Sequence, residues 1–307
     1  MVSYEIAVGL FFLFQTGFGI LGNSFLLGLY IVIFFVGPRM RPIDLFLTHL
    51  VFVNDLVLLL KGIPQTMAAF GLTNFLNDVG CKLVFYFHKV ARDLSLCTTC
   101  LLSGFQAITL SSKSFWWSKF KARAPKYSVP FYFICWTFHL LTNHKILLYM
   151  NSPKESNNIT KRKNYIYCDS ITAVSLDIKQ YLLTISLPDV LWIGFMVGTS
   201  GYMIYVLYRH RQRVQYVHGI RLTPCGSPET RATQTILLLV ILFVSFYSLN
   251  SILALYIYYE KSSSWLFHIS AFLSACFPAC SSFVLIVSDS QVRRCYLALW
   301  EKTMIQF

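Results

Sequence analysis

Four residues that could do chemistry stand close together inside one long apolar stretch. His88, Lys89, Arg92 and Asp93 lie within residues 83–110, where no other residue carries a charge. Charged side chains are costly in an apolar environment and usually have a function there. Lys89 and Asp93 are four residues apart, so they can pair on one face of a helix. The cluster is therefore either an ion pair that orders the structure or part of a ligand site.

One helical face can be traced through this cluster. Phe85, His88 and Arg92 follow the spacing of three and four residues that defines a face, and Lys89 lies at its flank. Asp189 is a further candidate, because it follows a proline and a kinked helix with polar neighbours often lines a cavity. We expect these five residues to contribute to binding a weakly polar or anionic small molecule. The competing interpretation is that the two basic side chains form structural ion pairs with Asp189 and with the aspartate that follows Arg92.

The other reactive side chains do not form a catalytic or metal-binding pattern. Cys97 and Cys100 have the spacing of a redox or zinc motif, but no second cysteine pair or histidine lies near them in the sequence. A His-Glu-x-x-His motif, a glycine-rich phosphate-binding loop and a serine nucleophile elbow are all missing from the sequence. We therefore expect no enzyme activity, no catalytic residue, no metal and no cofactor.

The chain that must position these residues is suited to lipid rather than to water. Of its 307 residues, 56% are hydrophobic and only 13% are charged, whereas a soluble domain carries about 25% charged residues. Its net charge of +13 does not indicate nucleic acid, because the basic residues lie in short stretches between apolar runs. Membrane lipid is therefore an expected partner, and nucleic acid is not.

Seven stretches have the length and apolar character of a membrane-spanning helix, which needs about 20 such residues. They cover residues 6–36, 45–72, 83–110, 129–150, 181–208, 233–259 and 265–288. The alternating pattern of a transmembrane β-barrel is absent. The sequence therefore predicts an all-α membrane protein, a single seven-helix domain over residues 1–307 that ends in a short cytoplasmic tail at 289–307.

The loops predict which way the bundle faces, because lysine and arginine are enriched on the cytoplasmic side. Basic residues gather on one side, in two successive loops that hold Lys119, Lys121, Arg123, Arg209, Arg211 and Arg213. This places the N-terminus outside and the C-terminus inside. Asn158 begins a glycosylation sequon that then lies outside. Cys81 and Cys168 also lie on this oxidising side, where we expect them to form a disulfide.

Several long strings of residues, spread over nearly the whole chain, are specific enough to indicate a family. They are Gly62-Ile63-Pro64-Gln65-Thr66-Met67, Lys89-x-x-Arg92, the run from Leu101 to Ser111, Ser227-Pro228-Glu229, the run from Arg231 to Leu239, and Phe283-Val284-Leu285-Ile286 followed by Ser288-Asp289. Together they closely resemble the vomeronasal type-1 pheromone receptors. The Asp-Arg-Tyr and Asn-Pro-x-x-Tyr marks of rhodopsin-type receptors are missing here, as they are in that family.

The resemblance implies a G-protein-coupled receptor for pheromones or other small chemosignals in the plasma membrane of vomeronasal sensory neurons. Its expected partners are the chemosignal, bound in the outer half of the bundle, and a heterotrimeric G protein of the inhibitory class. A ligand that binds the active bundle better would shift the population toward it. The six basic loop residues would then contact the G protein.

Two positions depart from the family pattern, since Ser112 and Ser282 stand where proline is usual. These departures concern signalling rather than the fold. Cys295 is juxtamembrane, where reversible palmitoylation occurs. The alternatives in function are another chemosensory receptor, such as a bitter-taste receptor, and a membrane transporter. The long strings favour the vomeronasal family over the first, and the absence of internal repeats disfavours the second.

Overall fold

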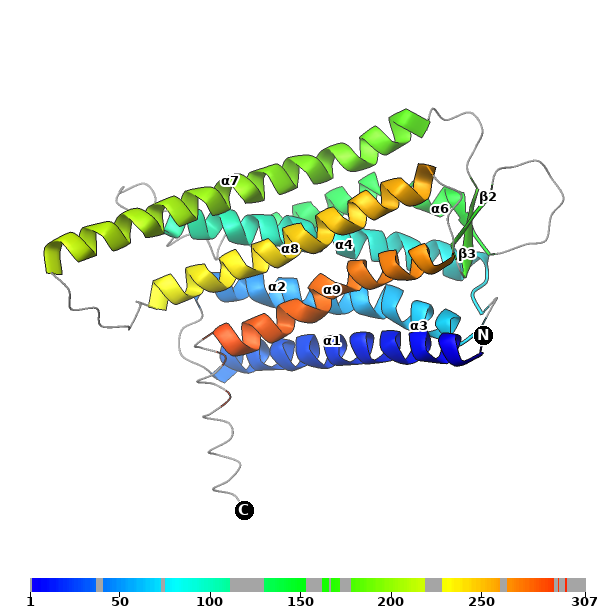
Figure 1. Cartoon of the computed structure of the whole chain (residues 1–307), viewed down its shortest axis with the longest axis horizontal. Helices are drawn as coiled ribbons and strands as arrows, with labels where there is room; N and C mark the ends of the chain where they lie inside the picture. Colours follow the sequence, from blue (N-terminus) through cyan, green and yellow to red (C-terminus); the bar gives the residue numbers. More distant parts are fainter. Residues whose placement is uncertain are drawn as a thin grey trace, which may run out of the picture.

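The computed structural model describes residues 2–36, 41–72, 75–110, 130–152, 162–165, 167–171, 178–218, 228–259 and 264–289, together with Val292 and Tyr296. The helices run side by side along the longest axis, and a small sheet lies at one end, beside the start of the chain (Figure 1). We call this the sheet end of the bundle. Within the described residues, six helices are long and apolar enough to cross a membrane, and a shorter seventh stands beside them. The predicted all-α seven-helix architecture is therefore confirmed.

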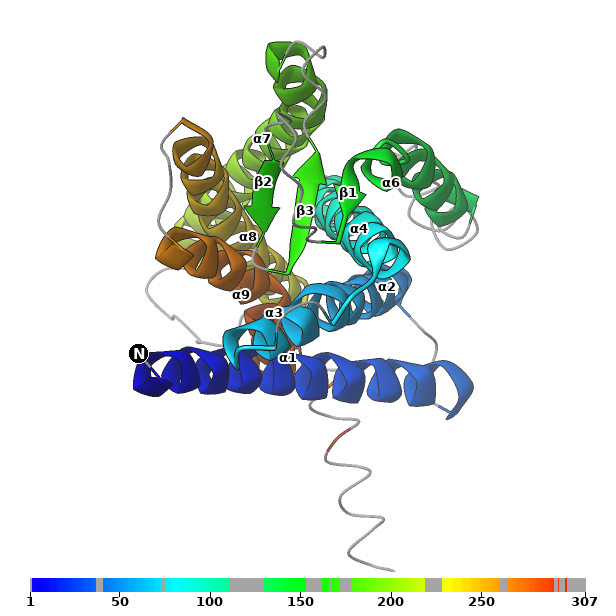
Figure 2. The ribbon, with the colours of Figure 1, turned by 90° about the vertical axis from the view of Figure 1, so that its right-hand side faces the viewer.

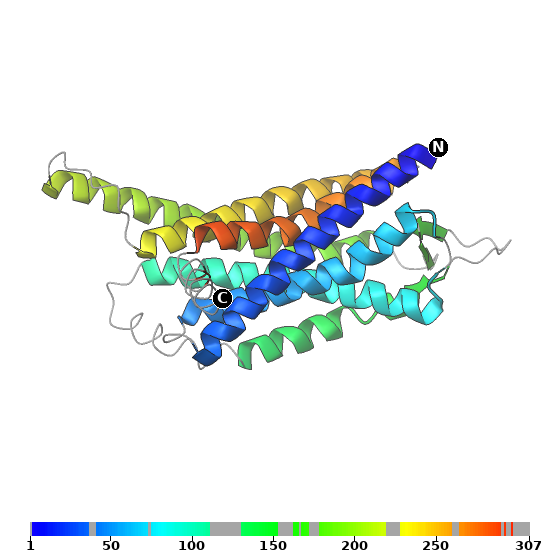
Figure 3. The same cartoon turned by 90° about the horizontal axis from the view of Figure 1, so that it is seen from below.

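The seven helical columns follow the order of the chain. They are α1 (Val2–Val36), α2 (Pro42–Val57) continued by η1 (Leu58–Gly62) and α3 (Ile63–Ala69), α4 (Asp78–Leu110), a helix over residues 130–142 followed by α6 (Ile146–Tyr149), α7 (Ile178–His218), α8 (Pro228–Tyr259) and α9 (Ser264–Ser288). Seen down the bundle, α1 lies along one side of it, below the other helices (Figure 2), and it crosses them obliquely in the view from below (Figure 3).

Several helix boundaries differ from the hydropathy prediction, and three of these differences are explained as follows. The fourth helix ends at residue 142 rather than 150, because the Asn143 side chain donates to the His139 carbonyl (3.0 Å) and a turn follows. The third helix begins at Asp78 rather than 83, because Asn77 caps it by accepting from the Gly80 amide (2.7 Å). The fifth runs on to His218, since a helix with charged residues can continue beyond an apolar span.

The second column is not a regular α-helix throughout. Leu58–Gly62 forms a π-turn just before Pro64, which has no amide hydrogen for a regular helical bond. Gly62 in this turn allows α1 to pass closely, because a Cβ atom added at Gly62 would collide with the Thr16 side chain. The π-turn and its glycine therefore determine the position of Lys61 relative to the neighbouring helices.

Polar contacts join the helices at the middle of the bundle. Asn54 donates to Ser281 Oγ (3.0 Å) and accepts from Ser95 Oγ (2.8 Å), so one amide joins α2, α4 and α9. Asn23 donates to the Pro278 carbonyl (2.9 Å), which joins α1 to α9. Each contact satisfies hydrogen-bonding groups that lipid could not satisfy. Together the contacts fix the positions of four helices relative to one another along the bundle axis.

An arginine fixes the opposite end of the bundle. Arg41 donates to Asp44 (2.7 Å) at the start of α2 and to Asp289 (2.8 Å) just after α9. Both aspartates are buried. Because Arg41 offers its donors in a fixed planar fork, it can hold two carboxylates at once. The end of the last helix is therefore tied to the beginning of the second.

A three-stranded antiparallel sheet covers the sheet end in the order β1, β3, β2, formed by Met150–Asn151, Cys168–Ile171 and Arg162–Tyr165. Figure 2 shows it lying across the ends of the helices. A disulfide joins Cys81 of α4 to Cys168, with the two Cα atoms 6.0 Å apart. Tyr167 is buried beside the disulfide against Phe85. The expected glycosylation residue Asn158 lies outside the described residues.

The disulfide should contribute strongly to stability, because it closes a separation of 87 residues in the chain. Loop-closure entropy assigns such a crosslink about 4–5 kcal/mol as an upper value. We expect the double variant Cys81→Ser/Cys168→Ser to unfold at a clearly lower temperature in thermal unfolding of purified protein. Cys280→Ser, which removes a half-buried free thiol, is the control. Equal melting temperatures for the double variant and the control would contradict the prediction.

Candidate functional site

The charged cluster on α4 divides between two sets of partners. Lys89 forms an ion pair with Asp93 (Nζ to Oδ1, 2.5 Å), and Asp93 also accepts from Asn143 Nδ2 (2.9 Å). Asn143 follows the helix over residues 130–142. Lys89 and Asp93 therefore act as a structural pair that joins two neighbouring helices, in agreement with the competing interpretation from the sequence.

Arg92 takes part in a second cluster that spans three helices. Its guanidinium carbon lies 4.6 Å from the centre of the Tyr247 ring, in a cation–π contact. Its Nη2 atom lies 3.7 Å from Asp189 Oδ2, and the Tyr247 hydroxyl donates to the same oxygen. Arg92 of α4, Asp189 of α7 and Tyr247 of α8 therefore meet at one point. The position of the Asp189 carboxylate is thus fixed by Arg92 and Tyr247.

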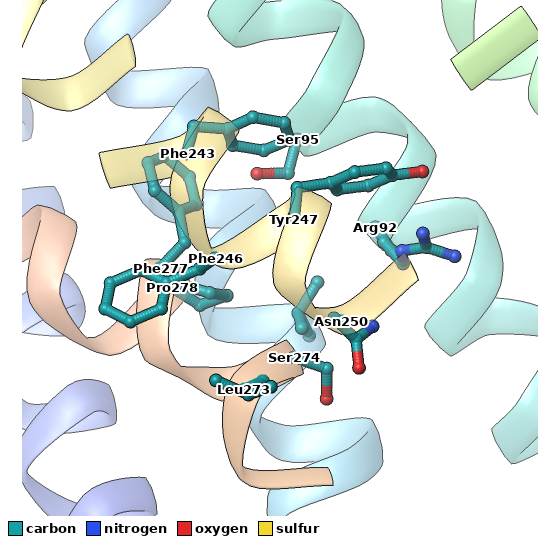
Figure 4. A pocket seen from close by; sticks show the side chains of 11 residues that line it. Arg92, Ser95, Phe243, Phe246, Tyr247, Asn250, Leu273, Ser274, Phe277 and Pro278 are labelled. Atoms are coloured by element: carbon teal, nitrogen blue, oxygen red, sulfur yellow. The ribbon is translucent and has the colours of Figure 1, made fainter. Parts of the chain in front are cut away.

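A small cavity of about 30 Å³ opens between α4, α8 and α9. Phe243, Phe246 and Phe277 gather on one side of it, and Arg92 and Asn250 lie on the other (Figure 4). The remaining lining residues are Val57, Ser95, Tyr247, Leu273, Ser274 and Pro278. A mostly apolar wall with a few polar groups is the usual character of a site for a small organic molecule.

The structure assigns different surroundings to the five predicted ligand residues. Arg92 lines the cavity, whereas Phe85 packs on Tyr167 with ring centroids 5.6 Å apart. Lys89 and Asp189 are held in the two ion pairs. His88 lies one turn from Arg92, and its buried Nε2 atom has no hydrogen-bond partner within the part of the chain that the structure describes. The structure therefore brings the predicted residues to the same half of the bundle, but only one of them to the cavity wall.

The prediction from sequence missed the contribution of α8 and α9. Phe243, Phe246, Tyr247 and Asn250 recur at intervals of three and four residues, which is the spacing of one helix face. Asn250 is the polar residue in this run, and it accepts from Ser270 of α9 (2.9 Å). The signal that could have found it is an amide side chain within the uncharged predicted span 233–259.

The remaining sequence candidates lie away from the cavity. The side chains of Cys97 and Cys100 point to different neighbours, since Cys97 Sγ lies 3.3 Å from Cys135 Sγ and Cys100 Sγ lies 3.9 Å from the Trp192 carbonyl. Ser282 is buried in α9, where its hydroxyl donates to the Ala279 carbonyl (2.9 Å). Ser112 and Cys295 lie outside the described residues.

The six basic residues expected at the G protein are only partly described. Arg209, Arg211 and Arg213 belong to α7, which extends at the end opposite the sheet (Figure 1). The side chain of Arg209 is exposed and lies 3.4 Å from the Tyr205 hydroxyl. Lys119, Lys121 and Arg123 lie outside the described residues.

Comparisons with known proteins agree over almost the full length. The family model of the vomeronasal organ pheromone receptor family matches residues 6–298. Vomeronasal type-1 receptor 1 of Gorilla gorilla gorilla is 44% identical over 306 residues, covering 99% of this chain and 86% of that protein. Vomeronasal type-1 receptor 4 of Homo sapiens is 42% identical over 303 residues, covering 98% and 100%. The crystal structure of squid rhodopsin shares the fold with a TM-score of 0.75 at 13% identity, covering 99% of this chain and 87% of that one.

The ion pair between Lys89 and Asp93 leads to a test of its structural role. Asp93→Asn leaves a buried ammonium without its counter-charge, which should cost about 3–5 kcal/mol and lower the amount of receptor at the cell surface. Lys89→Met/Asp93→Leu removes both charges and should recover most of that loss. Surface labelling and thermal unfolding measure both effects. If the double variant is no better than Asp93→Asn, the pair does not act as proposed.

Proposed function

The chain belongs to the vomeronasal type-1 receptor family, and we propose on this basis that a small chemosignal binds in the cavity between α4, α8 and α9 and shifts the bundle to a state that activates a G protein. The family and the rhodopsin-like fold make it a multi-pass membrane receptor of the chemosensory class rather than an enzyme. We further propose that it acts in the plasma membrane of vomeronasal sensory neurons, with its N-terminus outside and a G protein of the inhibitory class inside.

The cavity itself is the observation that carries this proposal. Its lining supports the proposal rather than its volume, which is about 30 Å³ and far below the roughly 300–1,000 Å³ usual for small-molecule sites. Four aromatic rings form part of its wall, while Arg92, Ser95 and Asn250 offer hydrogen-bonding groups. A weakly polar molecule that widens this cavity buries its apolar surface there and is oriented by one or two polar contacts.

The position of the cavity supports a route from ligand to signal. Ser95 lines it and also donates to Asn54, which in turn donates to Ser281 of α9. A ligand that draws α8 toward α4 therefore acts on a polar network that already joins three other parts of the bundle. A ligand can shift the receptor only as far as it binds one arrangement of this network better than the other.

Ligand binding can be tested with matched variants of α8. Asn250→Ala and Phe246→Ala change the cavity wall, whereas Ile252→Ala changes a side chain on the outer surface of the same helix. In cells that express the receptor with a G protein and are exposed to a chemosignal panel, the two cavity variants should lose potency by about tenfold or more, because each removes roughly 1–3 kcal/mol of binding. Dose–response curves are normalised to surface receptor. Equal potency for Asn250→Ala and Ile252→Ala would place the ligand elsewhere.

G-protein coupling has a separate test. Replacing Arg209, Arg211 and Arg213 together with glutamine should reduce activation at equal surface level if these arginines contact the G protein. The competing explanation is that their charge only orients the chain and meets lipid head groups, which predicts unchanged activation. The matched control replaces Lys161, Arg162 and Lys163, a basic run in the loop expected outside. Pertussis toxin, which blocks inhibitory-class G proteins, should abolish the response.

A further inference from the structure

One basic side chain inside the bundle has no ion-pair partner among the described residues. Lys89 is matched by Asp93 and Arg92 by Asp189. Lys61 of η1 lies within a span expected to cross the membrane, and it has no ion-pair or hydrogen-bond partner in the described part of the chain. The buried carboxylate earlier in the same column, Asp55, accepts from Ser24 instead. The half-buried ammonium of Lys61 therefore has no counter-charge beside it.

Lys61 is close to two further groups that can interact with negative charge. The η1 turn packs on α4. Lys61 lies one turn after Val57, as His88 lies one turn before Arg92, and Val57 and Arg92 line the same cavity. His88 Nε2 is buried and has no hydrogen-bond partner among the described residues, although an imidazole N–H is a good donor to an anion. Three cationic or donor groups from two helices therefore face one region.

Arg92 keeps donors available for a further partner. The 3.7 Å between its Nη2 and Asp189 Oδ2 exceeds a hydrogen-bond distance, so this contact is ionic rather than hydrogen-bonded. A guanidinium has five N–H donors, and the cation–π contact with the Tyr247 ring uses none of them in a hydrogen bond. Val57, one turn before Lys61 along the same column, lines the cavity together with Arg92. The unmatched charge therefore lies next to the cavity.

We infer that Lys61, His88 and Arg92 form a binding site for one anionic group, adjoining the cavity on its sheet side. This deepens the proposed function and rests on it, because Arg92 belongs to both the cavity and the anion site. The anionic group carries a single negative charge and accepts hydrogen bonds. Its source is either a free inorganic ion, such as chloride, or the acidic group of an organic ligand. Either source supplies the counter-charge that Lys61 lacks within the protein.

The test measures the melting temperature of the intact purified receptor in a neutral maltoside detergent, at constant ionic strength. One arm compares sodium chloride and sodium bromide with sodium gluconate. The other compares naphthalene-2-sulfonate with naphthalene-2-sulfonamide, which has the same ring system without the charge. We expect at least one of the anions to raise the melting temperature by about 3 °C or more at saturation. Lys61→Met should abolish this rise, and Lys145→Met, which changes an exposed lysine, should retain it.

Each result decides the matter. A rise with the halides identifies a free ion, and a rise with the sulfonate alone identifies an acidic organic ligand; both support the site. Lys61→Met should also melt higher than the wild type in gluconate, because it removes the unmatched charge. No rise in the wild type with any anion, or an equal rise in Lys61→Met, would overturn the inference. His88→Phe, which should weaken the rise, provides a second variant. Because this test does not measure signalling, it can disprove the anion site while the proposed receptor function stands. A failure of the proposed receptor function would likewise leave the anion site standing.

Discussion

The structure depends on one constraint, which is that lipid offers no hydrogen bonds and no counter-charges to the groups inside it. Polar side chains within the bundle are therefore stabilised by partners in the protein itself, many of them on another helix. Asn54 bonds to two serines from different helices, and Asp93 bonds to a lysine one turn away and to an asparagine just after the next helix. These contacts specify which helices are neighbours, since apolar surfaces alone slide past one another in lipid without a strong preference.

The helices themselves could be predicted from the sequence, whereas their mutual orientation could not. A long run of apolar residues predicts a membrane-spanning helix. The i,i+4 spacing of Lys89 and Asp93 predicts a local ion pair, and the structure contains it. The cavity was out of reach because α8 is apolar on all sides, so no face is marked as inward. Residues that are far apart in the chain, such as Ser95, Asn250 and Ser274, meet only when three helices are packed together. The π-turn that carries Lys61 leaves no trace in hydropathy at all.

The sheet end shows how a short loop structure can control the region beside the cavity. The disulfide holds β3 against the start of α4, and the buried Tyr167 ring rests on Phe85, one turn from His88. Ser152, which follows β1, donates both its amide and its hydroxyl to Asp78 (2.8 and 2.6 Å). The same helix therefore carries the anchor of the sheet, the structural ion pair and the polar wall of the cavity. Its position is overdetermined, which suits a helix against which others move.

The close passage of α1 over Gly62 bears on how inherited variants of this receptor should be interpreted. A methyl group at Gly62 collides with Thr16, whereas a methyl at Gly17 or Gly28 meets nothing within 4 Å. A glycine-to-alanine change is thus silent at two positions of the first helix and disruptive at a third site in the second column. The disruptive change touches no ligand, yet it displaces the turn next to Lys61. An inherited change at Gly62 would therefore disturb the packing of α1 on the second column without changing any residue of the cavity wall.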